Sequence, residues 1–194
     1  MAGRTDPIII ADACEKHGIE GGFRVRELHE RYFACLREEL PRETPGRRIL
    51  PGVVELLDAL HGDESSLLGL LTGNLATSAR LKLEQFGLWR YFRAGAFGDD
   101  GATRNDLVPV AAERVAGLGH PRPMPSQTIV IGDTVHDVAC ARAGGARSLA
   151  VATGSCRRDE LHAAGADAVL DDLSQTAVVL RLLDELVEVE PAGS

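Results

Sequence analysis

The chain has 194 residues, of which 44% are hydrophobic and 26% are charged, the balance of a folded globular domain. Its net charge is −8, its pI is near 5.2, and no run of five or more basic residues occurs. Nucleic acids and anionic membranes require a basic surface, so we expect neither as the main partner. No apolar stretch approaches the roughly 18 residues of a membrane span, and residues 1–7 lack the layout of a signal peptide.

The four cysteines, Cys14, Cys35, Cys140 and Cys156, are widely spaced and form no C-x-x-C pair. This spacing favours neither a disulfide framework nor a zinc site. Free thiols are typical of a reducing compartment, so we expect a cytoplasmic protein.

The apolar pattern of residues 6–40 predicts two helices. Helix-spaced apolar residues fill residues 6–40, with a break at Gly21-Gly22. The stretch 41–48 contains two prolines and three arginines and indicates a connector. A further helix is expected to begin at Leu50-Pro51-Gly52, with proline in its first turn.

From residue 67 onward, short apolar runs alternate with amphipathic segments. The pattern predicts strands at 67–71, 94–97, 128–131, 148–152 and 168–170, and helices at 76–86, 107–116, 137–143, 158–164 and 176–189. This alternation is typical of an α/β fold with a Rossmann-like parallel sheet and helices on both faces. The continuous apolar run at 128–131 predicts a strand buried on both sides. In such sheets the ligand site lies beyond the carboxyl ends of the strands.

Two aspartates follow the strand at 128–131. Asp133 comes directly after it, and Asp137 lies four positions later in the first turn of the next helix. Neighbouring carboxylates repel each other and favour a counter-ion, and Mg²⁺ commonly binds one or two carboxylates together with waters and phosphate oxygens. The alternative is that Asp133 caps the helix and Asp137 is an ordinary first-turn acid.

The strand at 67–71 ends in Thr72-Gly73-Asn74. A hydroxyl, a glycine and the free N–H groups of a starting helix can hold a phosphate, whereas the competing interpretation is a helix cap and a tight turn. Arg104 precedes the helix at 107–116 and can bind phosphate oxygens in a fork. A lone arginine is otherwise an exposed surface residue.

Together these motifs resemble the haloacid dehalogenase-like hydrolases. L-L-T-G-N at 70–74 looks like the second motif of that family, Arg104 occupies the place of its third, and G-D-T-V-H-D at 132–137 looks like its fourth. The resemblance covers about residues 50–173. It implies an α/β core at 49–194. For 1–48 it implies part of the helical cap found in phosphoglycolate-phosphatase-like members, in which a loop such as 3–6 can face the substrate or, alternatively, cap a helix.

The resemblance also implies an activity, namely Mg²⁺-dependent hydrolysis of a small phosphorylated metabolite. Thr72, Gly73, Asn74 and Arg104 would bind the phosphoryl group, with Thr72 and Arg104 assisting the reaction. Asp133 and Asp137 would hold Mg²⁺. These motifs set neither the substrate nor the oligomeric state.

One motif of the family has no counterpart before Leu50. It is a strand ending in D-x-D-x-T, which lies in the middle of the sheet and whose first aspartate is the nucleophile. The apolar run at 8–12 ends in Asp12 but lacks the second aspartate and the threonine. Two interpretations stay open: a chain that starts late, which we favour because the other motifs are intact, or a degenerate relative.

In either case we expect this chain to be inactive alone, and a non-catalytic binding or interaction protein is the alternative function. A Rossmann-type nucleotide binder is disfavoured, because no G-x-G-x-x-G follows a strand.

Overall fold

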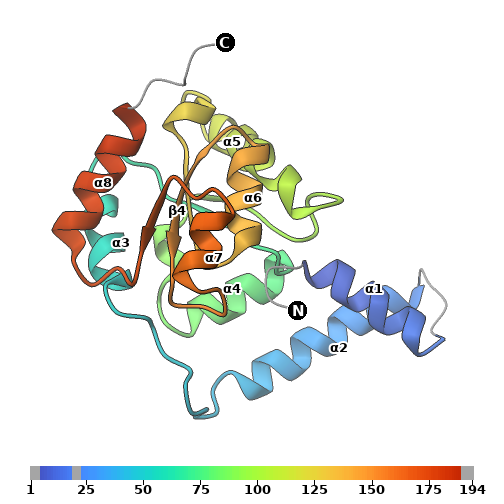
Figure 1. Ribbon diagram of the computed structural model, residues 1–194. Coiled ribbons are helices and arrows are strands. Elements are labelled where there is room, and N and C mark those ends of the chain that lie inside the picture. Colours follow the sequence, from blue (N-terminus) through green and yellow to red (C-terminus); the bar gives the residue numbers. More distant parts are fainter. Residues whose placement is uncertain (1–4, 19–22, 189–194) are drawn as a thin grey trace.

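The computed structural model describes residues 5–18 and 23–188 (Figure 1). The helices are α1 (Asp6–Lys16), α2 (Phe23–Glu39), α3 (Val53–His61), α4 (Ala76–Glu84), α5 (Leu107–Gly117), α6 (Val135–Ala143), α7 (Arg158–Ala163) and α8 (Thr176–Glu188). The strands are β1 (Gly69–Leu71), β2 (Ala94–Ala96), β3 (Ile129–Gly132), β4 (Arg147–Val151) and β5 (Ala168–Leu170). Short 3₁₀ turns are η1 (Trp89–Tyr91), η2 (Arg104–Asp106) and η3 (Pro125–Gln127).

All strand pairs are parallel, and helices separate consecutive strands, so the predicted α/β class is confirmed. Within the described residues the strands form two sheets, with the orders β1-β2 and β3-β4-β5. In these sheets β1 pairs only with β2, and β3 pairs only with β4. The expectation of a further central strand stays a prediction.

Helices cover both faces of the three-stranded sheet. On one face Leu149 of β4 packs with Leu56 of α3 and with Val179 of α8. On the other face Ala150 of β4 packs with Val138 of α6 and with α7. Successive side chains of a strand point to opposite faces, so β4 reaches both cores. A third core under α5 joins residues of β1, β2 and β3, and therefore links the two sheets.

Burial of β3 on both sides was predicted, and this is wrong at one position. Val130 is buried in the core under α5, but Ile131 is 38% exposed. Ile131 points to the opposite face, where it lines a pocket together with Leu50 and Leu173. The apolar pattern of a strand indicates which side chains can be buried, but not whether another element covers them.

The entry to α3 depends on a glycine. Gly52 has a φ of 78°, in the left-handed region that favours glycine. A Cβ atom at this position would lie 1.9 Å from the carbonyl oxygen of Leu173. The L-P-G sequence therefore ends the connector, and its glycine allows the backbone to lie close to Leu173 in the loop before α8.

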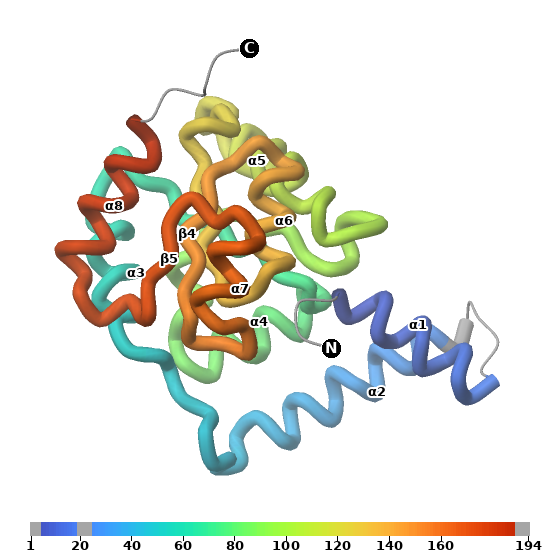
Figure 2. Tube along the Cα trace, viewed as in Figure 1, coloured from blue at the N-terminus to red at the C-terminus, as the bar shows by residue number. Residues whose placement is uncertain are grey.

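Helices α1 and α2 project from the rest of the molecule (Figures 1 and 2). The first turn of α1 lies against the start of α4, where the Asp6 N–H donates to the carbonyl of Gly73 at 2.6 Å. Both helices match the prediction, whereas the predicted break at Gly21-Gly22 lies outside the described residues. A boundary at residue 48 between a cap and a core stays a prediction. Within the described ranges, no helix has the length and apolar character needed to cross a membrane.

Candidate active site

Asp137 is bound to the start of its own helix. Its Oδ2 accepts hydrogen bonds from the N–H of Thr134 at 3.0 Å and from the Thr134 hydroxyl at 2.8 Å. This is a capping box with Thr134 as the N-cap residue, so the interpretation of Asp133 as the cap is wrong. The box needs Gly132, because a Cβ there would lie 2.2 Å from Asp137 Cγ.

Arg104 contacts the other carboxylate oxygen of Asp137. The side chains of this ion pair are only 17% and 8% exposed, respectively. The thiol of Cys140, on α6, donates to the Arg104 carbonyl at 3.0 Å, and burial raises the pKa of this thiol to about 11. Arg104 is therefore a cation held beside the fourth motif and not an exposed surface residue, while its role in phosphate binding stays a prediction.

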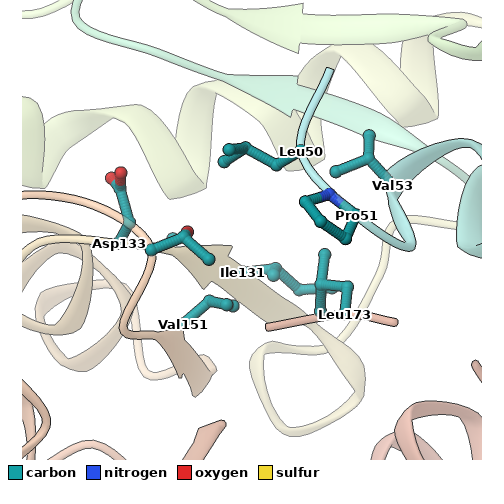
Figure 3. Close-up of a pocket in the computed structure, with 9 residues that line it drawn as sticks. Leu50, Pro51, Val53, Ile131, Asp133, Val151 and Leu173 are labelled. Atoms are coloured by element: carbon teal, nitrogen blue, oxygen red, sulfur yellow. The ribbon is translucent and has the colours of Figure 1, made fainter. Parts of the chain in front are cut away.

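Asp133 is the second acid of the pair, and it borders a pocket of about 170 Å³. Figure 3 shows its carboxylate pointing away from Ile131 and Val151, which line the apolar part of this pocket. Burial, and then the neighbouring charge of Asp137, raise the pKa of Asp133. Gly154 closes one side, since a Cβ there would lie 2.3 Å from Asp133 Oδ2.

These groups fit a magnesium ion held mainly by solvent and ligand oxygens. Across the described residues, no cluster of three or more His, Cys, Asp and Glu side chains is present. Mg²⁺ does not need such a cluster, because it often keeps several waters and uses one or two carboxylates with phosphate oxygens. Asp137 already accepts three protein hydrogen bonds. Asp133 would therefore be the better direct ligand, and a cation beside it would offset the repulsion between the two acids.

The Thr72-Gly73-Asn74 segment forms a second polar cluster at the end of β1. The Thr72 N–H continues the sheet by donating to the carbonyl of Ala96 at 3.0 Å. The Thr72 hydroxyl oxygen accepts from the Asn74 backbone N–H at 3.2 Å and from Asn74 Nδ2 at 2.9 Å. Lys82 Nζ donates to Asn74 Oδ1 at 2.5 Å. Sequence reasoning missed Lys82, because a half-buried lysine on a helix carries no motif of its own.

The start of α4 does not offer all the free N–H groups that were predicted. The Leu75 N–H donates to Asp6 Oδ2 at 3.0 Å, and the Ala76 N–H donates to Asp99 Oδ1 at 3.1 Å. These two N–H groups are therefore not free to bind a phosphate, and binding by Thr72, Gly73 and Asn74 stays a prediction. The carboxylates occupy the two N–H groups because Leu75, as the N-cap residue, has no side chain that can cap the helix.

The predicted loop at 3–6 lies only partly within the described residues. Thr5, which is 2% exposed, is the N-cap residue of α1 but makes no side-chain capping hydrogen bond, and Asp6 binds α4 instead of capping its own helix. Within the described residues, the sites around Asp133 and around Thr72 share no hydrogen bond. What they share is their location after the carboxyl ends of parallel strands, where ligands of such sheets bind.

Comparison with known proteins matches these features to one family. The model of a family described as HAD-hydrolase-like matches residues 105–176. The match begins one residue after Arg104 and includes Asp133 and Asp137. The chain is 31% identical over 169 residues to a phosphoglycolate phosphatase of Agrobacterium fabrum, covering 86% of this chain and 67% of that relative. This chain belongs to the haloacid dehalogenase-like hydrolase family.

A second relative of this haloacid dehalogenase-like chain is named Probable phosphatase IndB, from Dickeya dadantii. The two are 32% identical over 166 residues, which are 78% of this chain and 64% of the relative. A phosphoglycolate phosphatase of Salmonella typhimurium is 27% identical, and the match covers 59% of it. The chain thus spans about two thirds or less of the curated relatives it matches.

Solved structures support the fold. A hydrolase from Pseudomonas syringae superposes with a TM-score of 0.65 at 23% identity, covering 95% of this chain and 80% of that one. CbbY from Rhodobacter sphaeroides, solved in complex with phosphate, gives a TM-score of 0.58 at 22% identity, covering 80% and 67%. At these identities the likeness shows the haloacid dehalogenase-like fold alone.

Proposed function

We propose that this chain carries the magnesium-binding and phosphate-binding parts of a phosphatase that hydrolyses a small phosphorylated metabolite. The observation that supports this most directly is the largely buried Arg104–Asp137 ion pair, whose charges act on the neighbouring Asp133. It provides one fixed cation for phosphoryl oxygens and one carboxylate for a metal. The phosphatase names of the relatives agree with this chemistry.

The residues divide the work between two sites. Asp133 would hold Mg²⁺, which supplies positive charge to the phosphoryl oxygens when it is bound. Arg104 would bind a phosphoryl oxygen, and Asp137 would keep its guanidinium in place. Thr72 would donate its hydroxyl to a second phosphoryl oxygen, with Gly73 allowing the close approach. The arm of α1 and α2 would act as the cap, bound to the core through Asp6.

The proposal for the chain as given is ligand binding without turnover. The D-x-D-x-T motif that carries the family's nucleophile is not found in residues 1–50, and the hydrogen bonds described for the Thr72 hydroxyl come from Asn74 and not from a base that could activate it as a nucleophile. A cytoplasmic location belongs to the same proposal, which the four free cysteines support. We propose no nucleic-acid or membrane partner, given the net charge of −8.

The experiment is a titration of the 194-residue chain with inorganic phosphate in the presence of Mg²⁺, followed by NMR, beside an assay with p-nitrophenyl phosphate. We expect phosphate binding that depends on Mg²⁺ and no measurable hydrolysis. Thr72→Val and Asp133→Asn should each weaken phosphate binding about tenfold, the loss of a charge-assisted interaction. Binding unchanged by both substitutions would overturn the proposal.

A complementation assay separates a catalytic unit from a non-catalytic relative. A synthetic peptide with an apolar strand ending in D-x-D-x-T is added to the chain, because β1 and β3 each have a backbone edge unpaired by another described strand. Hydrolysis that appears with this peptide, but not with a peptide whose first aspartate is asparagine, supports the phosphatase. Phosphate binding with no hydrolysis in either mixture favours a binding protein.

A further inference from the structure

The hydrogen bonds around Thr72 determine the direction in which its hydroxyl can donate. A hydroxyl has one donor and two acceptor sites. The Thr72 oxygen accepts from the backbone N–H of Asn74 at 3.2 Å and from its side-chain Nδ2 at 2.9 Å. Both acceptor sites are thereby used. The hydroxyl proton must therefore donate to some other group.

The Asn74 amide can donate to Thr72 only in one of its two orientations. If the amide were rotated by 180°, its oxygen would face Thr72 and would itself accept the hydroxyl proton. Lys82 excludes that orientation, because an ammonium has three donors and no acceptor. Its Nζ lies 2.5 Å from Asn74 Oδ1. The amide oxygen must point to Lys82, and the amide nitrogen must point to Thr72.

We propose that Lys82 and Asn74 are positioning residues that force the Thr72 hydroxyl to act as a hydrogen-bond donor to a phosphoryl oxygen. This inference rests on the proposed function, because it takes Thr72 as a phosphate ligand. The ammonium, the amide and the hydroxyl form one chain of bonds, and each donor in such a chain polarises the next. A dianionic phosphoryl group fits its end, because its oxygens only accept.

In this arrangement Lys82 acts through Asn74 and is not itself a phosphate ligand. Lys82 lies on α4, eight positions beyond Asn74, and reaches the site through the amide. Arg80, two residues earlier on the same helix, instead pairs with Glu84 on an exposed face. Arg80→Met therefore removes an equal charge from α4 without changing the bonds to Thr72, and it is the matched control.

Substitutions at Lys82 and Asn74 distinguish a lysine that binds phosphate directly from one that acts through the Asn74 amide. Lys82→Met frees the amide to rotate and capture the Thr72 proton, so phosphate binding should weaken about tenfold, the loss of an interaction with a charged partner. Asn74→Ala removes the competing acceptor as well as the donor, so binding should weaken only about threefold. Adding Asn74→Ala to Lys82→Met should therefore restore part of the lost affinity. Asn74→Asp should be the weakest binder, since its carboxylate accepts the proton outright.

The test is a double-mutant cycle on the 194-residue chain, titrated with inorganic phosphate in Mg²⁺ and followed by NMR, with Thr72→Val as reference. Lys82→Met should also shift the side-chain amide signals of Asn74 before phosphate is added, while Arg80→Met and Lys82→Arg should not. Partial recovery in the double variant is the expected result. The inference would be overturned if Lys82→Met lowered the phosphate affinity equally in the parent and in Asn74→Ala. It would also be overturned if the Asn74 amide signals did not shift. Either result would leave the proposed function standing. A Thr72→Val variant that binds phosphate like the parent would overturn both.

Discussion

The guanidinium of Arg104 contacts the carboxylate of Asp137, although the two residues are 33 positions apart in the chain. The contact joins the turn before α5 to the first turn of α6 and is largely shielded from solvent. A buried charge without its partner is costly, because removal of one member leaves the other unpaired in a poorly solvated place. The pair therefore stabilises the local fold and holds a cation and an anion close to Asp133.

Removal of this cation should destabilise the chain markedly. For Arg104→Met we expect a loss of about 3 kcal/mol in the free energy of unfolding, the range for breaking a buried ion pair. Denaturation by urea measures it. Arg122→Met is the control, because its pair with Glu113 is exposed and should contribute little. Equal stability of Arg104→Met and the parent would contradict the assigned role of the pair.

The position of Asp133 should depend on a glycine in another loop. Gly154→Ala places a Cβ 2.3 Å from Asp133 Oδ2, so the carboxylate must move. We expect Mg²⁺ affinity to fall about tenfold, as for changes to groups that orient a metal ligand. Isothermal titration calorimetry measures the affinity. A Cβ at Gly117 would meet no atom within 4 Å, so Gly117→Ala should bind Mg²⁺ like the parent.

The contact of the α1–α2 arm with the core should depend on Asp6. Asp6→Ala removes the carboxylate that accepts the Leu75 N–H, and Ser78 Oγ lies 3.1 Å from the same oxygen. Loss of a helix cap typically costs about 1 kcal/mol, and we expect this loss together with faster hydrogen exchange at the Leu75 amide. The exposed Glu15 of the same helix supplies the control, Glu15→Ala. Unchanged exchange at Leu75 in the Asp6 variant would show that another group caps α4.

The loop after β2 should give a pH-dependent contribution to stability. Burial alone would raise the pKa of Asp100, but the hydrogen bonds from Arg114 and from the Phe97 N–H outweigh it and lower the pKa. The stabilisation is therefore fully present above the pKa of the unfolded chain and is lost as the pH falls through the lower folded value. Because Arg114 is 42% exposed, Asp100→Asn should lower stability at pH 7 by no more than about 1 kcal/mol. Urea unfolding of both proteins from pH 7 to pH 2 should show this gap closing, whereas a gap that widens in acid would contradict the sign.

Much of the fold could be predicted because short apolar runs and amphipathic helices alternate so regularly. The strand at 168–170 matches β5 residue for residue, and every predicted helix is present. The division into two sheets and the exposure of Ile131 could not be predicted, because both depend on which elements lie beside β3. Pairing between strands is a long-range property that apolar periodicity does not contain.

The candidate site was predictable where a motif has a fixed spacing and less so where a contact is long-range. Asp133, Asp137 and Thr72 were identified from their positions after strands, and Arg104 from its position before a helix. The structure brings Arg104 and Asp137 into contact, while the roles of all four residues stay predictions. The sequence did not reveal that Thr134 caps α6, nor that Asp6 and Asp99 cap α4 from distant parts of the chain. Lys82 was missed although it lies only eight positions from Asn74, because a lysine on a helix carries no motif of its own.

The most direct test of the central claim is the binding of Mg²⁺ to the 194-residue chain and to Asp133→Asn, measured by isothermal titration calorimetry at pH 7. Asp184→Asn on the exposed face of α8 removes the same charge far from the site and is the control. The account predicts one Mg²⁺ site in the parent and in Asp184→Asn, and its loss in Asp133→Asn. Equal Mg²⁺ binding by all three proteins would contradict it.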